Sequence, residues 1–159
     1  AAGLGEALGD GRRLELDLAD DLPSAVADPE ALTTALVNLL DNACKYSAGA
    51  DLDDLDPEAH LDAEAPGPSR TVHLSLRRDG DHLAYAVADR GIGIPRAELG
   101  RIFHRFYQVD RRLQRRTDGT GLGLAIVKAI ADAHRGAVDV ESRVDHGSTF
   151  TLRVPIEGA

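Results

Sequence analysis

The 159-residue chain contains a single cysteine, Cys44, so it cannot form a disulfide within itself. The neighbours Leu39, Leu40 and Ala43 are apolar, which predicts that Cys44 is a small buried residue. The chain has no run near the roughly 20 apolar residues that cross a bilayer. Its amino terminus also lacks a basic segment followed by an apolar one. We therefore expect a soluble, cytoplasmic piece of protein that does not span a membrane.

Basic residues are in the minority, with 18 Lys and Arg against 27 Asp and Glu and a net charge of −9. This balance argues against a nucleic-acid surface, because phosphate backbones need clustered cations. The segment from Arg101 to Arg116 is the exception, since its arginines face only one acidic residue, Asp110. Taken alone, the segment would be interpreted as a solvated arginine-rich loop. The segment contains Phe103 and Phe106 and lies between two glycine clusters, at 91–93 and 119–123. In this position it is better explained as a mobile cationic lid over a polyphosphate.

The spacing of apolar residues predicts one domain, 1–159, with few elements. Leu14, Leu16 and Leu18 alternate with acidic residues, as in a strand with one buried face. A helix is expected from Asp28-Pro29-Glu30 to about Tyr46. The other expected elements are strands at 71–77 and 82–89 joined by Asp79-Gly80, a short helix from Pro95 to near Ile102, a helix at 122–134 with Leu124, Ile126, Val127 and Ile130 inward, and strands at 138–142 and 149–155. They predict an α+β fold, a two-layer sandwich of a mixed, mostly antiparallel sheet covered on one face by about three helices.

Two segments lack such patterns. The opening, 1–11, is small and glycine-rich and is expected to fray. Residues 48–69 are rich in aspartate, glutamate and proline, have no basic residue, and are expected to form an acidic insertion loop. A calcium loop does not fit there, because Leu55 takes the place of the third ligand and the glycine of the turn is missing.

Three motifs carry the candidate chemistry. Asp89-Arg90-Gly91-Ile92-Gly93-Ile94 follows a predicted strand, and Gly119-Thr120-Gly121-Leu122-Gly123-Leu124 opens a predicted helix. Glycines allow close backbone approach and leave amide donors free, and a helix amino terminus suits phosphate. In the first predicted helix, Asn38, Asn42 and Lys45 form a polar stripe beside the apolar one. A lone Gly-x-Gly is usually a turn, but the three motifs in this order indicate a nucleotide pocket.

This set resembles the catalytic and ATP-binding domain of sensor histidine kinases, in the wider superfamily of gyrase, the Hsp90 chaperones and the mismatch-repair ATPases. The matching segments are 38–46, 89–94, the aromatic 103–107, 119–124 and 147–150, so the resemblance covers nearly the whole chain after Asp28. It implies a Bergerat-type fold in a single catalytic ATP-binding domain with a flexible ATP lid at 101–118. The implied cofactors are ATP and Mg²⁺.

The resemblance also implies roles for individual residues. Asn42 and Asn38 would hold Mg²⁺ and Lys45 would meet the phosphates, so these three are the expected catalytic residues. Asp89 would accept a hydrogen bond from the adenine amino group, which favours ATP over GTP. Gly147 would support the pocket floor. The other expected ATP-binding residues are Tyr46, Gly91, Gly93, Ile94, Arg105, Tyr107, Gly119, Thr120, Gly121, Leu122, Gly123, Leu124 and Thr149.

The implied reaction is phosphoryl transfer in a two-component system. Superfamily members that hydrolyse ATP typically carry glutamate where this chain has Asn38, and an amide cannot act as a general base. The expected acceptor is a histidine on a separate dimerisation domain, and the expected downstream partner is a response regulator. Gln108 stands where many relatives have arginine, so Arg105, Arg111 or Arg112 would replace that arginine, or Gln108 would approach the metal. A nucleotide-responsive interaction module with vestigial catalysis and an anti-sigma-type serine kinase stay open as alternatives.

Overall fold

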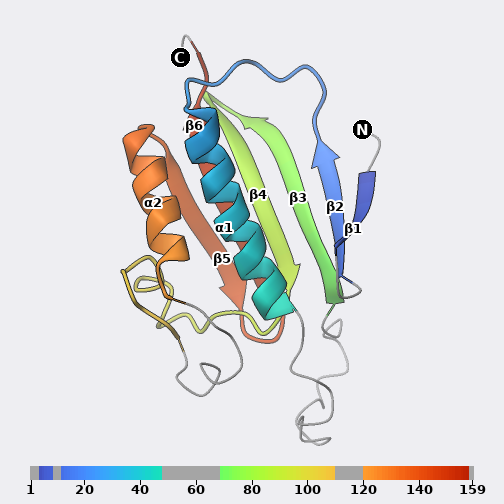
Figure 1. The fold of residues 1–159 in the computed structure, drawn as a ribbon, viewed down its shortest axis with the longest axis vertical. Helices are drawn as coiled ribbons and strands as arrows, with labels where there is room; N and C mark the ends of the chain where they lie inside the picture. Colours follow the sequence, from blue (N-terminus) through green and yellow to red (C-terminus); the bar gives the residue numbers. More distant parts are fainter. Residues whose placement is uncertain (1–3, 9–11, 48–68, 110–119, 158–159) are drawn as a thin grey trace, which may run out of the picture.

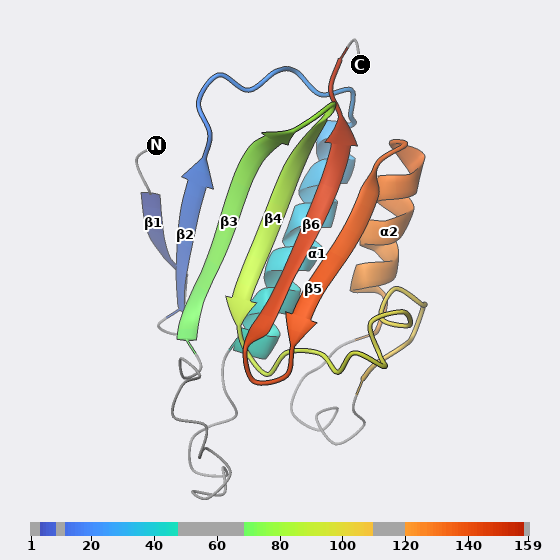
Figure 2. The same ribbon diagram turned by 180° about the vertical axis from the view of Figure 1, so that it is seen from behind.

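The computed structural model describes residues 4–8, 12–47, 69–109 and 120–157. These residues form two layers, a sheet and a pair of helices that lie on one of its faces, α1 (Pro29–Ser47) and α2 (Gly123–Ala133) (Figure 1). The view from behind shows that no described helix covers the other face of the sheet (Figure 2). The predicted α+β sandwich is therefore confirmed. Within the described residues, no helix has both the length and the hydropathy of a membrane-crossing segment.

The sheet has six strands in the order β1-β2-β3-β4-β6-β5. Their bounds are β1 Leu4–Leu8, β2 Arg12–Leu18, β3 Ser69–Asp79, β4 His82–Arg90, β5 Ala137–Arg143 and β6 Gly147–Pro155. Only the β2–β3 pair is parallel among these strands, so the sheet is mixed and mostly antiparallel, as predicted. The prediction that the opening frays is wrong for Leu4–Leu8, because these residues pair with β2 along their whole length.

Helix α1 begins where the sequence predicts. The Asp28 carboxylate accepts the backbone N–H groups of Glu30 at 2.9 Å and Ala31 at 3.3 Å, which caps the helix. Four small or apolar side chains spaced by four residues are buried on the face toward the sheet, namely Ala35, Leu39, Ala43 and Ser47. The polar stripe that contains Asn38 and Asn42 is offset by about 100° from these buried residues and therefore lies on the flank of the helix.

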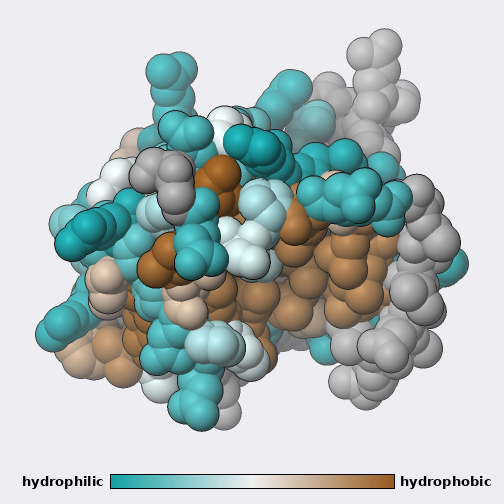
Figure 3. Space-filling view, turned by 90° about the horizontal axis from the view of Figure 1, so that it is seen from above, coloured by the Kyte–Doolittle hydropathy of each residue, from teal (hydrophilic) through white to brown (hydrophobic). Residues whose placement is uncertain are grey.

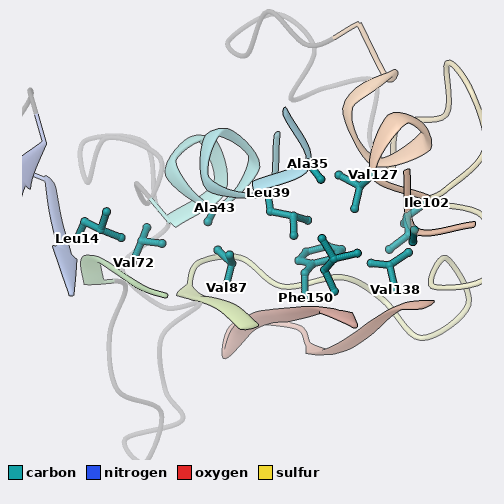
Figure 4. Packing of buried hydrophobic residues seen from close by; sticks show 12 residues of the cluster. Leu14, Ala35, Leu39, Ala43, Val72, Val87, Ile102, Val127, Val138 and Phe150 are labelled. Atoms are coloured by element: carbon teal, nitrogen blue, oxygen red, sulfur yellow. The ribbon is translucent and has the colours of Figure 1, made fainter. Parts of the chain in front are cut away.

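The core lies between the helices and the central strands (Figure 4). Leu39 of α1 points toward Val87 of β4 and Phe150 of β6, and these three side chains are at most 2% exposed. The Phe103 ring packs edge-on against Phe150, with 6.5 Å between ring centres. This contact ties the start of the expected lid segment to the core, so that segment has a fixed origin.

Seen from the end where α1 begins, the molecule shows apolar surface among hydrophilic residues (Figure 3). Leu18, the last residue of β2, is 43% exposed, and Val26, in the segment that leads from β2 to α1, is 60% exposed. Cys44 is only half-buried rather than fully buried, and burial raises the pKa of its thiol. An unreactive, packing role for Cys44 agrees with both observations.

The expected helix after Pro95 does not form. Backbone N–H groups donate over three residues in succession, Glu98 to Pro95 at 2.8 Å, Arg101 to Glu98 at 2.8 Å and His104 to Arg101 at 2.9 Å. These are consecutive turns and not the four-residue bonds of an α-helix. The described residues therefore contain two helices where about three were expected.

The other differences concern single positions and segment bounds. Ile126, expected to face inward, is 39% exposed, while its neighbour Val127 is fully buried. Of the expected insertion 48–69, residues 48–68 lie outside the described residues, and Ser69 begins β3. Residues 110–118 of the expected lid and Gly119 also lie outside them.

Candidate functional site

A pocket opens at the end of the molecule where α1 ends, β4 ends and α2 begins, which is the lower end in Figure 1. Its lining residues come from α1, β4, the turns that follow β4, the start of α2 and the start of β6. They are Asn38, Asp41, Asn42, Lys45, Tyr46, Asp89, Ile92, Gly93, Ile94, Ile102, Tyr107, Gln108, Val109, Thr120, Gly121, Gly123, Leu124, Ser148 and Phe150.

The polar stripe of α1 forms one wall. The Asn38 side-chain amide donates to the Thr34 carbonyl at 2.8 Å, and a Cβ built on Gly123 would lie 2.9 Å from Asn38 Oδ1. The first turn of α2 can approach α1 this closely because Gly123 has no side chain. Farther along, Lys45 Nζ lies 2.6 Å from Asp41 Oδ2. The wall thus presents amide oxygens beside a cation that is already paired with a carboxylate.

The opposite end of the pocket is built around Asp89, which is 7% exposed. Its Oδ1 accepts the Gly91 N–H at 2.8 Å, and the Ser148 N–H also donates to the carboxylate. Burial raises the pKa of Asp89, and these two backbone hydrogen bonds lower it in part. The carboxylate is therefore held in place by fixed backbone donors within the protein interior.

The turn after Asp89 is locked by backbone contacts. A Cβ on Gly91 would lie 1.9 Å from the Tyr46 carbonyl oxygen, and a Cβ on Gly93 would lie 2.0 Å from the Arg143 carbonyl oxygen. Gly93 also has a positive φ of 65°. No other residue type fits these two positions without moving the chain, which explains both glycines of the first motif.

The start of α2 faces the pocket with its amide groups. Leu122 makes no side-chain hydrogen bond that caps the helix, and the first turn contains no acidic residue. Gly121, with φ 67°, lies against Phe106, whose N–H donates to the Gly121 carbonyl at 2.9 Å. An uncapped helix amino terminus that carries no negative side chain is suited to bind an anion.

The structure brings most of the predicted site residues to this pocket. Those that line it are Asn38, Asn42, Lys45, Tyr46, Asp89, Gly93, Ile94, Tyr107, Thr120, Gly121, Gly123 and Leu124. Gly91 and Leu122 do not line it, but Gly91 packs behind Asp89 and Leu122 lies between two lining glycines. Gly119 lies outside the described residues. Whether each lining residue binds a ligand stays a prediction.

Two predicted residues do not line this pocket, and whether they bind a ligand stays a prediction. Arg105 is exposed and does not line the pocket, because it stands at the corner of a turn closed by the Tyr107 N–H and the His104 carbonyl at 3.2 Å. Thr149 is also absent from the lining, since side chains alternate along a strand and its neighbours Ser148 and Phe150 face the pocket. It lines an adjacent, more open hollow together with Asp89 and Ser148.

The pocket also contains residues to which the sequence reasoning assigned no role. They are Asp41, Ile92, Ile102, Val109, Ser148 and Phe150. Gln108, for which an approach to the metal was one of the alternatives, lines the pocket as well. A signal for Ser148 was present in the sequence. If Phe150 is in the core, alternation places Ser148, two residues earlier, on the same face.

A buried carboxylate, a stripe of amide oxygens and an uncapped helix amino terminus around one pocket, on this α+β sandwich, define a nucleotide-binding domain. Residues 27–158 match the family described as histidine kinase-, DNA gyrase B-, and HSP90-like ATPase. The chain belongs to this family.

Relatives and solved structures similar to the chain carry histidine kinase names. The chain is 37% identical over 142 residues to the circadian input-output histidine kinase CikA of Synechococcus elongatus, covering 89% of this chain and 16% of CikA. It is 40% identical over 144 residues to the sensor-like histidine kinase SenX3 of Mycobacterium tuberculosis, covering 89% of this chain and 30% of SenX3. The chain thus spans a third or less of the length of these two relatives.

Two solved structures share the fold. Full-length ShkA in complex with AMPPNP has a TM-score of 0.65 and 30% identity, over 92% of this chain and 26% of ShkA. The mycobacterial sensor histidine kinase MprB has a TM-score of 0.61 and 25% identity, over 90% of this chain and 82% of that one. The α+β architecture described above is therefore that of histidine kinase catalytic domains.

Proposed function

We propose that the chain is the ATP-binding catalytic domain of a two-component sensor histidine kinase, which presents Mg-ATP for phosphoryl transfer to a histidine on a separate dimerisation domain. The observation that carries this proposal is the convergence of Asp89, the α1 stripe and the amino end of α2 on one pocket. The named relatives and the AMPPNP complex of ShkA support it. A response regulator as downstream partner and a cytoplasmic location belong to the same proposal.

Asp89 is proposed to recognise the base. Its carboxylate is an acceptor held by the N–H groups of Gly91 and Ser148, so the adenine amino group can donate to it without any rearrangement of the loop. Guanine places a carbonyl oxygen at that position, which would oppose two acceptors and leave the ligand side of the buried carboxylate without a donor. ATP is therefore preferred over GTP.

The α1 stripe has the donor chemistry that Mg²⁺ requires. The amide nitrogen of Asn38 donates to the Thr34 carbonyl, its side-chain oxygen lies beside Gly123 at the amino end of α2, and Asn42 lies one turn later on the same wall. Mg²⁺ prefers oxygen ligands and usually binds through one or two protein groups with phosphate and water. Asn42 and Asn38 would hold it, where it would neutralise charge on the phosphates.

The remaining residues position the polyphosphate. The amide groups at Gly121 and Gly123 lie at the amino end of α2, and Lys45 can exchange its exposed contact with Asp41 for a phosphate. We assign 101–118 as the lid, with Tyr107 and Gln108 on its inner side. No carboxylate occupies the place of Asn38, so the pocket aligns ATP for an outside nucleophile instead of activating water.

The test is calorimetry of the chain with ATP and GTP, each with and without Mg²⁺, followed by addition of the histidine-bearing dimerisation domain of the full-length protein. We expect ATP to bind at least about tenfold more tightly than GTP, with Mg²⁺ strengthening binding. The phosphorylated product should be acid-labile, as phosphohistidine is. Equal binding of both nucleotides, or an acid-stable phosphoserine, would contradict the proposal. The relatives named above are histidine kinases, which favours this function over the interaction module and the serine kinase.

A further inference from the structure

A pair of serines ends the inward face of the hairpin formed by β5 and β6. Ser142 and Ser148 are cross-strand partners, and the preceding inward pair, Val140 and Phe150, is apolar. Ser148 is 6% exposed and lines the pocket beside Asp89, whereas Ser142 lies behind it. A hydroxyl pair therefore replaces apolar packing at the point where the sheet meets the base-binding end of the pocket.

The Ser142 hydroxyl makes three hydrogen bonds. It accepts the Ile94 N–H at 2.8 Å, donates to the Gly147 carbonyl at 2.9 Å and lies 2.9 Å from Ser148 Oγ. A hydroxyl has one proton, and a carbonyl can only accept, so the proton of Ser142 is used by Gly147. In the bond between the two serines, Ser148 must therefore be the donor.

This arrangement fixes what Ser148 can offer to a ligand. Since its only proton points toward Ser142, its remaining capacity on the pocket side is that of an acceptor. The neighbouring Asp89 carboxylate is an acceptor too. The base-binding end of the pocket thus carries two adjacent acceptors and matches a group with two N–H donors, as a purine 6-amino group has.

The same hydroxyl connects the loop after β4 to the hairpin. Ile94 belongs to that loop and Gly147 to the hairpin turn, and a second link joins them where the Asp145 N–H donates to the Ile92 carbonyl at 2.9 Å. The loop is therefore attached to the β5–β6 hairpin by these hydrogen bonds. Loss of one hydroxyl would leave this second link in place, so the loop would keep its attachment.

We propose that Ser142 is a positioning residue for base selection, which orients the Ser148 hydroxyl as an acceptor and so helps the pocket to choose a 6-amino over a 6-oxo purine. The inference rests on the proposed function, because it assumes that a nucleoside triphosphate occupies the pocket. Ser142 does not touch the base, and it acts through Ser148. Without Ser142, the Ser148 hydroxyl is free to rotate and to donate to a 6-oxo group.

The experiment compares ATP with inosine triphosphate, which carries a 6-oxo group and no 2-amino group, in calorimetry of the chain with Mg²⁺. In Ser142→Ala we expect the preference for ATP to fall about tenfold, with weaker ATP binding and unchanged or tighter inosine triphosphate binding. Ser142→Thr keeps the hydroxyl and should restore the preference to within about twofold. Thr151→Ala removes a hydroxyl from the opposite face of β6 and is the matched control.

A second variant tests the inference independently in case Ser142→Ala does not fold. Ser148→Ala leaves the bonds of Ser142 to Ile94 and Gly147 in place, and it should lower the preference for ATP by a similar factor. The double variant should then show no further loss, because both residues act through one hydroxyl. An equal loss of affinity for both nucleotides in Ser142→Ala, or additive losses in the double variant, would overturn the inference. If the parent chain binds ATP but Ser142→Ala keeps the preference, only this inference fails, whereas a parent that binds neither nucleotide refutes the proposed function itself.

Discussion

The two ends of the pocket are built differently. At the base end, Asp89 is 7% exposed, its partners are backbone N–H groups, and a Cβ on Gly91 would clash with a carbonyl 1.9 Å away. At the phosphate end, Lys45 and Asp41 form an exposed side-chain pair, and Phe106 nearby is 74% exposed. In the proposed function, base selectivity is therefore a property of the fold, while charge neutralisation depends on side chains that can exchange partners.

The largest expected effect is at the base end, in Asp89→Asn. Whichever way the new amide turns, its NH₂ group faces a donor, either the adenine amino group or one of the backbone N–H groups that Asp89 accepts. We expect ATP affinity to fall at least about a hundredfold in calorimetry. Asp132→Asn removes an exposed carboxylate on α2 and should leave ATP affinity unchanged. Parental affinity in Asp89→Asn would contradict the role assigned to this residue.

The second effect tests whether the base end is rigid. Gly91→Ala forces a side chain against the Tyr46 carbonyl, so we expect a loss of about 3 kcal/mol in the free energy of unfolding, together with loss of ATP binding. Gly100→Ala is the matched control, since a Cβ there has no neighbour within 4 Å. Urea denaturation of both variants measures the difference. A Gly91→Ala protein as stable as the control would show that the loop after β4 can shift to accommodate a side chain at little cost in stability.

The third effect concerns the phosphate end, where we expect changes in binding without changes in stability. Lys45→Ala should weaken ATP binding about tenfold and make it less dependent on salt. It should alter the free energy of unfolding by less than about 0.5 kcal/mol, because the lost pair with Asp41 is exposed. Lys128→Ala breaks the equivalent pair with Asp132 on α2 and should leave ATP binding as it was. Equal effects of the two substitutions on ATP binding would contradict the assignment of Lys45 to the phosphate end of the pocket.

The smallest effect is the pH dependence that follows from the raised pKa of Asp89. A carboxyl whose pKa is higher in the folded than in the unfolded chain lowers stability as the pH rises between the two values. Asp89→Asn should therefore gain stability relative to the parent as the pH increases from about 4, the ordinary value for aspartate, through the raised pKa. Denaturation of the two proteins across that range measures the difference. A difference independent of pH would show that burial does not disfavour the charged form.

Local signals predicted the elements that local chemistry decides. Asp28 and Pro29 start α1 where expected, and the turn at Gly80 joins β3 to β4. The errors arose where partners distant in sequence decide the outcome. The opening segment forms β1 only because β2 is available to pair with it, and the segment after Pro95 forms turns while its Phe103 packs on Phe150.

The site shows the same division. Asn38, Asn42 and Asp89 reach the pocket because helix and strand spacing place them there. Ser148 lines the pocket on the same face of β6 as Phe150, whereas the predicted Thr149 lies on the alternate position of the strand. The role proposed for Ser142 depends on a cross-strand pair and on the loop after β4, and no local pattern reveals it.

We propose that one pocket holds the base, the phosphates and the metal together. Amide chemical shifts of the chain, followed while ATP and Mg²⁺ are added, test it directly. We expect simultaneous changes at Asn42, Gly91 and Gly121, with little change at Asp139 on the open face of the sheet. Changes confined to one of the first three sites, or centred elsewhere, would contradict it.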